Sequence, residues 1–569
     1  MKSVALHNLG CKVNAYELEV IGQKLQEKGY DIVSFDKKAD IYIVNTCTVT
    51  NIADRKSRQM LHRAKKMNPD AVVVAVGCYV QAGKEEALLD GSIDLAVGNN
   101  RKKDIVEILE AFLAKREKAG GRESGGDVWE EKTLSRRSVV DISREEAYEE
   151  MTLLRPQDEE GIGGEAGSNV GRGPEDGDPA GVGGGAFGAG GESGETALSA
   201  HTRAYIKIQD GCNQFCSYCI IPYARGRVRS RRQEDVLREI RGLAESGVKE
   251  VVLTGIHLSS YGMDFIDKTD GDYLENGKDL RGTAMERAYL LNLIRDIAAV
   301  DGIERIRLGS LEPRIITEEF AGGLAALPKV CPHFHLSLQS GCDETLKRMN
   351  RHYTTEEYYD KVALLRRVFA NPAVTTDVIV GFPGETEEEF AVTKRFLEKV
   401  NFFEMHVFKY SRRRGTVAAA MDNQVPEQVK AQRSAGLLEL ERQQSAAYRQ
   451  GYIGNEITIL TEEAREIDGK EYRIGHTETY VKAAVLAEKA GGKPVNIRQG
   501  SKAAWRGYPS AGKLDSRVSP SGLYRGFPCE CLCVWMWKKR TEDKKGIITK
   551  KTDSLLHTLN YVEIFRKVE

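Results

Sequence analysis

The sequence lacks any apolar run near the ~20 residues that a membrane-spanning helix needs. Its first residues, MKSVALHNLGCKVNAYELEV, contain no basic stretch followed by an apolar core, so no secretory signal peptide is predicted. Excess charge is also missing, because 83 Lys and Arg residues face 84 Asp and Glu residues, for a formal net charge of −1. We therefore expect a cytoplasmic protein without a membrane partner, in which contact with nucleic acid depends on local patches.

Cysteine, in contrast, is plentiful, with eleven residues in a chain of 569. In a reducing compartment, clustered cysteines bind metal or carry out redox chemistry more often than they form disulfides. Hydrophobic residues make up 41% of the chain and charged residues 29%, which is typical of a globular protein with real cores. The length predicts roughly three to four domains of ~150 residues each.

Two regions alternate strands with helices, and a glycine-rich stretch separates them. In residues 1–112 the runs VALHNLG, IYIVNTC and AVVVAVGC read as strands followed by helices, which predicts a parallel α/β domain. Residues 113–200 include GIGGEAGSNVGRGPEDGDPAGVGGGAFGAGGESGE, which has almost no large apolar residue, so we predict a disordered insert. No strand precedes these glycines and no G-K-[ST] follows, which excludes a P-loop.

Residues 201–442 resume the alternation with YIKIQDGC, EVVLTGIHL, RIRLGSLEP, FHLSLQSGC, TTDVIVGFPG and EMHVFKYS as strands. About six β/α units predict an open or closed barrel, so the fold class is α/β. In residues 446–505 the segments NEITILTEEA and YRIGHTETYVKAAV predict a small β domain. Residues 506–569 match no element and stay unassigned.

One cysteine motif stands at the end of the first barrel strand. Cys212, Cys216 and Cys219 form C-x3-C-x2-C in IKIQDGCNQFCSYCIIPYARGRVRSR. Thiolates are the usual ligands of [4Fe–4S] clusters, and three of them leave one iron open to a small molecule. The alternative is a zinc site or buried free thiols, but structural zinc prefers four ligands and no fourth Cys or His lies nearby.

Three further cysteines each follow a predicted strand of the first domain: Cys11 in LGCKVN, Cys47 in NTCTVT and Cys78 in VGCYVQ. The carboxyl ends of parallel strands share one edge of a sheet, where ligands gather. The three thiols are therefore predicted to converge on a second iron–sulfur cluster. The alternative is three buried small hydrophobic residues, since free cysteine is among the most buried residue types.

The C-x3-C-x2-C motif after a strand resembles the radical S-adenosylmethionine superfamily. There the open iron binds the amino and carboxylate groups of S-adenosylmethionine, and electron transfer cleaves the sulfonium to a 5′-deoxyadenosyl radical. The two cysteine sets in this order resemble the methylthiotransferase family, whose second [4Fe–4S] cluster takes part in delivering sulfur. The resemblance covers about residues 1–110 and 201–480 and implies a partial (β/α)6 TIM-like barrel, two [4Fe–4S] clusters, an electron donor and a sulfur donor.

Family members act on isopentenyladenosine in tRNA, on an aspartate of a ribosomal protein, or on threonylcarbamoyladenosine in tRNA. Three local sequences around the cysteines resemble those of the third branch: LGCKVNAYE, NTCTVTNIADRKSRQ and GCYVQ. The implied product is 2-methylthio-N6-threonylcarbamoyladenosine at position 37, in the anticodon stem-loop. Abstraction of hydrogen from C2 of the adenine needs a radical cofactor, and the protein supplies orientation and exclusion of water. The other two substrates remain as alternatives.

The resemblance also implies that strand ends of the barrel hold S-adenosylmethionine. The candidates are Thr254, Gly255, Ser310, Glu312, Gln339, Ser340 and Gly381. Ordinary turn chemistry is the alternative for each of them.

A run of arginines follows the cluster motif: Arg225, Arg227, Arg229, Arg231 and Arg232. Arginine is suited to phosphate and carboxylate recognition, so the run is predicted to contact the cofactor carboxylate or tRNA, with a solvated charged face as the alternative. A second, shorter run spans residues 412–414. The segment GYIGNEITILTEE to YVKAAV resembles the TRAM domain, a small β-barrel that binds RNA, and backbone contacts by such a module give affinity more than sequence reading.

Overall fold

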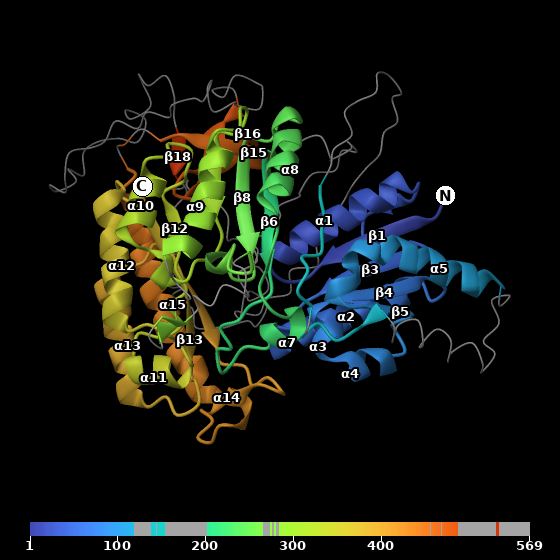
Figure 1. The fold of residues 1–569 in the computed structure, drawn as a ribbon, viewed down its shortest axis with the longest axis horizontal. Coiled ribbons are helices and arrows are strands. Elements are labelled where there is room, and N and C mark those ends of the chain that lie inside the picture. Colours follow the sequence, from blue (N-terminus) through green and yellow to red (C-terminus); the bar gives the residue numbers. More distant parts are fainter. Residues whose placement is uncertain are drawn as a thin grey trace, which may run out of the picture.

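The computed structural model describes residues 1–118, 138–143, 145–153, 202–265, 274–275, 278–279, 284–453, 455, 457–467, 469–487 and 531–533. Figure 1 shows an N-terminal α/β unit packed beside a curved sheet with outer helices, and a smaller sheet at one end. One large hydrophobic core includes residues from both the N-terminal sheet and the barrel. No helix among the described residues combines the length and apolarity needed to cross a membrane.

The N-terminal unit is a five-stranded parallel sheet in the order β2-β1-β3-β4-β5, which confirms the predicted α/β domain. Strands β3 and β4 are buried along their whole length, because helices cover both faces of such a sheet. The elements are β1 (Ser3–Asn8), α1 (Lys12–Glu27), β2 (Asp31–Val33), β3 (Ile41–Thr46), α2 (Asn51–Met67), β4 (Val72–Gly77), α3 (Cys78–Ala82), α4 (Lys84–Leu89), β5 (Leu95–Val97), the 3-10 turn η1 (Asn99–Asp104) and α5 (Ile105–Lys118).

The barrel consists of two sheets, β11-β8-β6-β7 and β12-β13-β14. Isolated parallel bridges from Ile306 to Val330 and from Leu311 to Leu336 link them, so β6, β8, β11, β12, β13 and β14 form the six parallel strands of the predicted partial barrel. Among the described residues no pairing joins β14 to β6. Helix α1 of the N-terminal unit packs against β6 and β8 instead, as Figure 1 shows.

The barrel strands are β6 (Arg203–Asp210), β7 (Arg229–Ser230), β8 (Glu250–Gly255), β11 (Arg305–Leu308), β12 (His333–His335), β13 (Ala373–Val380) and β14 (Glu404–Lys409), with a short pair β9 (Leu274–Glu275) and β10 (Lys278–Asp279). The helices and turns are α7 (Ile221–Arg225), α8 (Gln233–Glu245), η2 (Leu258–Ser260), α9 (Ala284–Ala298), η4 (Pro313–Ile315), α10 (Glu318–Ala325), α11 (Asp343–Arg348), α12 (Thr355–Val368), α13 (Glu387–Val400), α14 (Val417–Ala420) and α15 (Glu427–Gln450).

The C-terminal unit is an antiparallel sheet in the order β15-β16-β17-β18, with β15 (Ile459–Ile467), β16 (Lys470–Thr477), β17 (Lys482–Leu486) and β18 (Cys531–Cys533). It confirms the predicted small β domain. Strand β18 lies in the tail where the sequence predicted no element, and it pairs with β17. The rest of the predicted segments 488–505 and 506–569 lies outside the described residues.

The sequence-based boundaries of the glycine-rich insert need two corrections. Helix α5 continues to residue 118, past the boundary at 112, because its apolar positions pack into the core. Met151 and Leu153, inside the predicted disordered insert, are buried in the main core. Apolar residues of this segment thus fold onto the two domains, whereas residues 154–200 lie outside the described part.

Candidate functional site

The loop between β6 and α7 carries the first three thiols. Gly211 has a φ of +70°, and a Cβ there would lie 1.7 Å from the Arg227 carbonyl oxygen, so the turn into the loop requires glycine. The Cys212 amide donates to the Gly226 carbonyl (3.0 Å) and the Cys219 amide donates to the Cys216 carbonyl (2.9 Å). These bonds bend the loop so that the Cys212 and Cys216 thiols lie near Cys219, and burial and then both of these thiols raise the pKa of Cys219.

The end of α11 and the segment that follows it contact the cysteine loop through hydrogen bonds. The Ser217 amide donates to the Met349 carbonyl (3.0 Å), and the Asn350 side-chain amide donates to the Phe215 carbonyl (3.1 Å). The Arg351 guanidinium donates to the Cys216 sulfur at 3.3 Å. This contact places a positive charge beside one of the three sulfurs. Sequence reasoning missed Arg351, because 132 residues separate it from Cys219 and nothing near it has ligand spacing.

The second three thiols lie at the carboxyl edge of the N-terminal sheet. Cys47 and Cys78 follow β3 and β4 directly, and Cys11 precedes α1, just beyond β1. These three strands are neighbours in the sheet. A Cβ at Gly10 would lie 3.1 Å from the Cys47 sulfur, which brings the Cys11 loop against Cys47. The charges of Cys11 and Cys78 both affect the pKa of Cys47.

Arg225 connects the barrel to this second group of thiols. Its guanidinium is fully buried and donates to the Cys78 sulfur (3.3 Å), to the Asn14 side-chain oxygen (2.6 Å) and to Glu17 (2.8 Å). Asn99 donates to the same sulfur at 3.5 Å and to the Ala224 carbonyl at 2.7 Å. The helix that directly follows the C-x3-C-x2-C motif therefore contacts a thiol of the N-terminal sheet.

Both groups of thiols fit iron–sulfur clusters. Burial raises the pKa of Cys47 and of Cys212 to about 12, so these thiols are protonated until a metal displaces the protons. Each group offers three sulfur ligands with an arginine donor alongside, and three ligands would leave one iron of a [4Fe–4S] cluster open to a small molecule. Near the first group, the buried Nε2 atom of His257 has no partner among the described residues, which fits a bound small molecule that supplies one.

Three of the predicted cofactor residues lie at the end of β8 or close to the cysteine loop. Thr254 and Gly255 end β8, and Glu312 accepts from Arg314 (2.7 Å), which also reaches Gln214 of the cysteine loop (3.5 Å). A Cβ at Gly255 would lie 2.9 Å from the Gln209 side-chain oxygen, so this strand end is tightly packed.

The others lie in different surroundings. Ser310 is exposed, and Gln339 adopts a left-handed φ of 71°. The Ser340 hydroxyl bonds to Thr393 of α13 (3.2 Å), and Gly381 faces Lys430 of α15. Ser340 and Gly381 therefore contact the outer helices.

The two arginine runs differ from the prediction. Arg225, Arg229 and Arg231 are buried in internal contacts, including an ion pair from Arg231 to Glu239, whereas Arg227 and Arg232 are exposed. Arg413, in the second run, is buried and pairs with Asp54 of α2 at 2.6 Å. These buried guanidinium groups bind carboxylates of the chain itself, because they lie between the barrel and the N-terminal unit.

Polar side chains line the inner face of the barrel strands, and sequence reasoning did not single them out. Asp377 on β13 is the register partner of His406 on β14, and one donor atom from each of His335, Asp377 and His406 lies within 4.8 Å of the others. Their strand neighbours Val378 and Val407 belong to the apolar core. The sequence signal for a polar barrel interior was the presence of His and Asp residues between the apolar residues of these strands.

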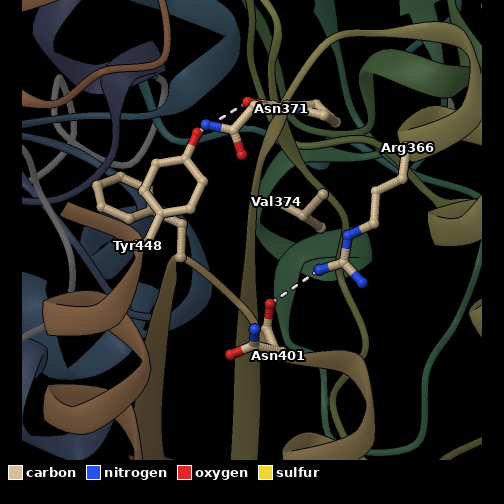
Figure 2. Close-up of a pocket in the computed structure, with 7 residues that line it drawn as sticks. Arg366, Asn371, Val374, Asn401 and Tyr448 are labelled. Atoms are coloured by element: carbon tan, nitrogen blue, oxygen red, sulfur yellow. Dashed lines mark hydrogen bonds between the residues drawn. The ribbon is translucent and has the colours of Figure 1, made fainter. Parts of the chain in front are cut away.

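A pocket of about 190 Å³ lies elsewhere, beside the start of β13. Figure 2 shows Arg366 donating to the Asn401 carbonyl (2.8 Å) and Tyr448 donating to the Asn371 carbonyl (3.0 Å). Because β13 begins at this end and the cysteine loop follows the carboxyl end of β6, the pocket is separate from the thiols.

Comparisons with known proteins match both halves of the chain. A family model described as the radical SAM superfamily matches residues 206–397, and one described as uncharacterized protein family UPF0004 matches residues 3–98. The chain is 36% identical over 511 residues to the threonylcarbamoyladenosine tRNA methylthiotransferase MtaB of Bacillus subtilis, covering 90% of this chain and 95% of the relative. It is 36% identical over 453 residues to the tRNA-2-methylthio-N(6)-dimethylallyladenosine synthase of Opitutus terrae, covering 78% and 84%.

Among solved structures, a radical S-adenosylmethionine methyltransferase, TsrM from Kitasatospora setae, matches with 17% identity and a TM-score of 0.44. The match covers 71% of this chain and 72% of that one.

Proposed function

This chain belongs to the radical S-adenosylmethionine methylthiotransferase family, and on that premise we propose that it converts N6-threonylcarbamoyladenosine at position 37 of tRNA to its 2-methylthio derivative. The observation that carries the proposal is the presence of two groups of three neighbouring thiols in one chain, each of which would leave one iron of a [4Fe–4S] cluster without a protein ligand. The local sequences around Cys11, Cys47 and Cys78 support this substrate, as does the similarity to the Bacillus subtilis relative over 511 residues.

In this proposal Cys212, Cys216 and Cys219 hold the cluster that takes S-adenosylmethionine, with Thr254, Gly255, Ser310, Glu312, Gln339, Ser340 and Gly381 as its candidate contacts. Cys11, Cys47 and Cys78 hold a second [4Fe–4S] cluster. When bound, the clusters and S-adenosylmethionine supply the radical and the sulfur that an unactivated aromatic C–H bond requires. The C-terminal sheet is the proposed RNA-binding module, and a sulfur donor and an electron donor are the remaining partners.

Residues of the chain contact both groups of thiols through hydrogen bonds. Arg351 and Arg225 donate to the sulfurs of Cys216 and Cys78, and hydrogen bonds to ligand sulfurs tune the potential of a cluster. Cys47 and Cys78 are buried, and low exposure protects reactive chemistry from water. The buried contacts of Arg225 hold the second group of thiols against the helix that follows the first.

Mass spectrometry of tRNA tests the proposal. The chain is expressed in a bacterial strain lacking its own tRNA methylthiotransferases, and digested tRNA is examined for 2-methylthio nucleosides. We expect the methylthio form of threonylcarbamoyladenosine, and none with the Cys212→Ala variant. Appearance of methylthio-dimethylallyladenosine instead would assign the chain to the branch that the Opitutus terrae relative represents.

A further inference from the structure

Two exposed side chains, an arginine and a tyrosine, contact the same aromatic ring of the cysteine loop. The Arg227 guanidinium lies over the ring of Phe215, with 4.6 Å between its central carbon and the ring centroid. The Tyr223 ring meets the same phenylalanine edge-on, with ring centroids 6.4 Å apart and an interplanar angle of 82°. Tyr223 is 51% exposed, and Arg227 is exposed as well. A planar cation and an aromatic ring therefore lie at the surface, joined through Phe215.

Backbone hydrogen bonds fix the position of this arginine and of the ring beneath it. The Phe215 carbonyl accepts from the Asn350 side-chain amide at 3.1 Å. The amide of Val228, the residue after Arg227, donates to the Asn213 side-chain oxygen at 3.2 Å. Both bonds involve the cysteine loop, so they hold Arg227 and Phe215 against each other. A guanidinium that already stacks on a ring loses little further freedom when a second flat group binds to it.

The surroundings of this surface are basic. Within the part of the chain that the structure describes, no carboxylate pairs with Arg227. The segment before α14 adds Arg412 and Arg414, which are both exposed. That segment reaches the cysteine loop through a hydrogen bond from the Ala418 amide to the Ser217 carbonyl at 2.7 Å. Exposed arginines from two segments around one loop favour an anionic partner, although the whole chain has a net charge of only −1.

The cysteine loop and the C-terminal sheet lie at opposite ends of the barrel, as Figure 1 shows. Strand β6 begins at Arg203, which pairs with Glu462 on β15, and it ends at Asp210, directly before the loop. Its eight residues, at about 3.3 Å each, separate the two ends by roughly 25 Å. The proposed RNA-binding module therefore contacts RNA away from the thiols, and another surface has to hold the bases around the target adenosine.

We propose that Arg227 and Tyr223 form a stacking surface for an unpaired base of the tRNA anticodon loop, next to the adenosine that reacts. This inference rests on the proposed function and deepens it. Proteins that bind single-stranded RNA stack its bases on aromatic rings and on guanidinium planes, within positively charged surroundings. Phe215 orients the guanidinium for such a stack. Because Phe215 lies between Cys212 and Cys216 in the sequence, the stacked base lies beside the first group of thiols.

A cycle that changes protein and RNA together tests the proposal. The holoenzyme and its Tyr223→Leu variant each bind a labelled anticodon stem-loop carrying N6-threonylcarbamoyladenosine, and a set of stem-loops in which one unpaired nucleotide at a time lacks its base. Loss of one base–aromatic stack should weaken binding of the intact RNA to the variant about 5-fold to 100-fold. Wild-type protein should lose as much at one abasic position beside the target adenosine, and the variant should lose nothing more there.

Further variants separate stacking from the attraction of phosphate. Tyr223→Phe keeps the ring and should restore the affinity that Tyr223→Leu loses. Arg227→Lys keeps the charge but loses the planar face, so it should weaken binding. Arg238→Gln, which changes a largely exposed arginine of α8, is the control and should bind like the wild type. Wild-type affinity in Arg227→Lys, with a weaker salt dependence in Arg227→Gln, would make Arg227 a phosphate contact and overturn its stacking role.

The outcomes distinguish this inference from the proposed function. Equal affinity of Tyr223→Leu and wild type for the intact RNA, when the wild type makes the methylthio product, would overturn the inference alone. Absence of product with the abasic pattern retained would overturn the proposed substrate and leave the stacking surface in place. Absence of any binding to the stem-loop would overturn both. Iron content is measured for every variant, and if Tyr223→Leu and Tyr223→Ala both fail to load the first cluster, Tyr223 supports that cluster and the proposal is wrong.

Discussion

At the scale of single residues, a buried arginine contacts the second group of thiols. Arg225 is entirely buried and shares Glu17 with Lys102 and Lys207, both of which are buried as well. Lys102 belongs to the N-terminal unit, whereas Lys207 and Arg225 belong to the barrel. The carboxylate of Glu17 therefore forms ion pairs with cations from both domains. The net charge near the Cys78 sulfur depends on these ion pairs, because Arg225 donates to that sulfur.

Replacing Arg225 with Gln should destabilise the protein and its second cluster. The change removes one partner of a buried pair, which costs about 3–5 kcal/mol, and it removes a donor to the Cys78 sulfur. Urea denaturation and iron content measure the two effects. Arg238→Gln is the control, because its pair with Asp235 on α8 is largely exposed and should matter by about 1 kcal/mol or less. Equal effects of the two changes would refute the assigned role of Arg225.

Single cysteine variants should separate the two clusters. Cys47→Ala is expected to lose the second cluster and keep the first, and Cys212→Ala is expected to do the reverse, because each thiol belongs to only one group. Iron and sulfide quantification after anaerobic reconstitution gives the measurement. Cys331 serves as the matched control, since it is buried in the barrel next to Arg307 and outside both groups. Full iron content in Cys47→Ala would contradict the second site.

At the scale of elements, the short turns that follow the strands set the positions of the thiols. Gly77 ends β4 with a φ of +107°, and a Cβ there would lie 2.6 Å from the Asn45 side-chain oxygen. Gly29, after α1, also has a positive φ of +83°, but a Cβ there would meet nothing within 4 Å. The two glycines thus share a backbone requirement and differ in the available space.

Gly77→Ala should therefore be the more harmful of two similar substitutions. Gly29→Ala carries only the strain of a left-handed backbone, about 1–3 kcal/mol. Gly77→Ala adds a collision with β3 that displaces Cys78. We expect a larger fall in unfolding free energy and loss of iron from the second cluster only in Gly77→Ala. Normal iron content in that variant would show that the strand end tolerates the shift.

The segment after α11 should set the potential of the first cluster. Arg351 places a positive charge 3.3 Å from the Cys216 sulfur, and positive charge favours the reduced cluster. Arg351→Met is expected to make the midpoint potential more negative in an EPR-monitored titration. Arg348→Met, which removes a half-exposed partner of Glu389, should leave it unchanged. An unaltered potential in Arg351→Met would remove this residue from the site.

At the scale of the whole molecule, a buried carboxylate links the barrel to the C-terminal sheet. Glu250 accepts from Arg307, whose guanidinium also donates to the Glu478 carbonyl at 2.8 Å. Arg203 joins Glu250 to Glu462 on β15. Glu250 is thus one of the links between the proposed RNA-binding module and the barrel, beside the Arg305 bond to the His476 carbonyl at 2.8 Å.

Acid should weaken this junction. Burial alone raises the pKa of Glu250, but Arg307 and Arg203 lower it from 4.5 to about 2. Because the folded pKa is depressed, the stabilisation is complete above pH 4.5 and is lost as the pH falls towards 2, about 3 kcal/mol in all. Unfolding free energy between pH 5 and pH 2 measures it. Glu250→Gln should lose that part of the slope, whereas Glu439→Gln on α15, with its half-exposed side chain, should keep it.

The chain's local patterns determined much of this protein. The apolar runs before Cys11, Cys47 and Cys78 predicted the parallel sheet and the second group of thiols, and the spacing of Cys212, Cys216 and Cys219 predicted the first group. The alternation of strands and helices in residues 201–442 predicted the six-stranded partial barrel. Strand period and ligand spacing are local properties, so they can be read from neighbouring residues.

Only the tertiary structure decided which distant groups meet. Arg225 and Arg413 were predicted to face a cofactor or tRNA, yet they pair inside the chain with Glu17 and Asp54. Arg351 carried no pattern of its own, because its role depends on a contact with Cys216, a residue more than 100 positions away. A charge acts through space and not along the sequence, so the partner of each buried cation was set when the two domains packed together.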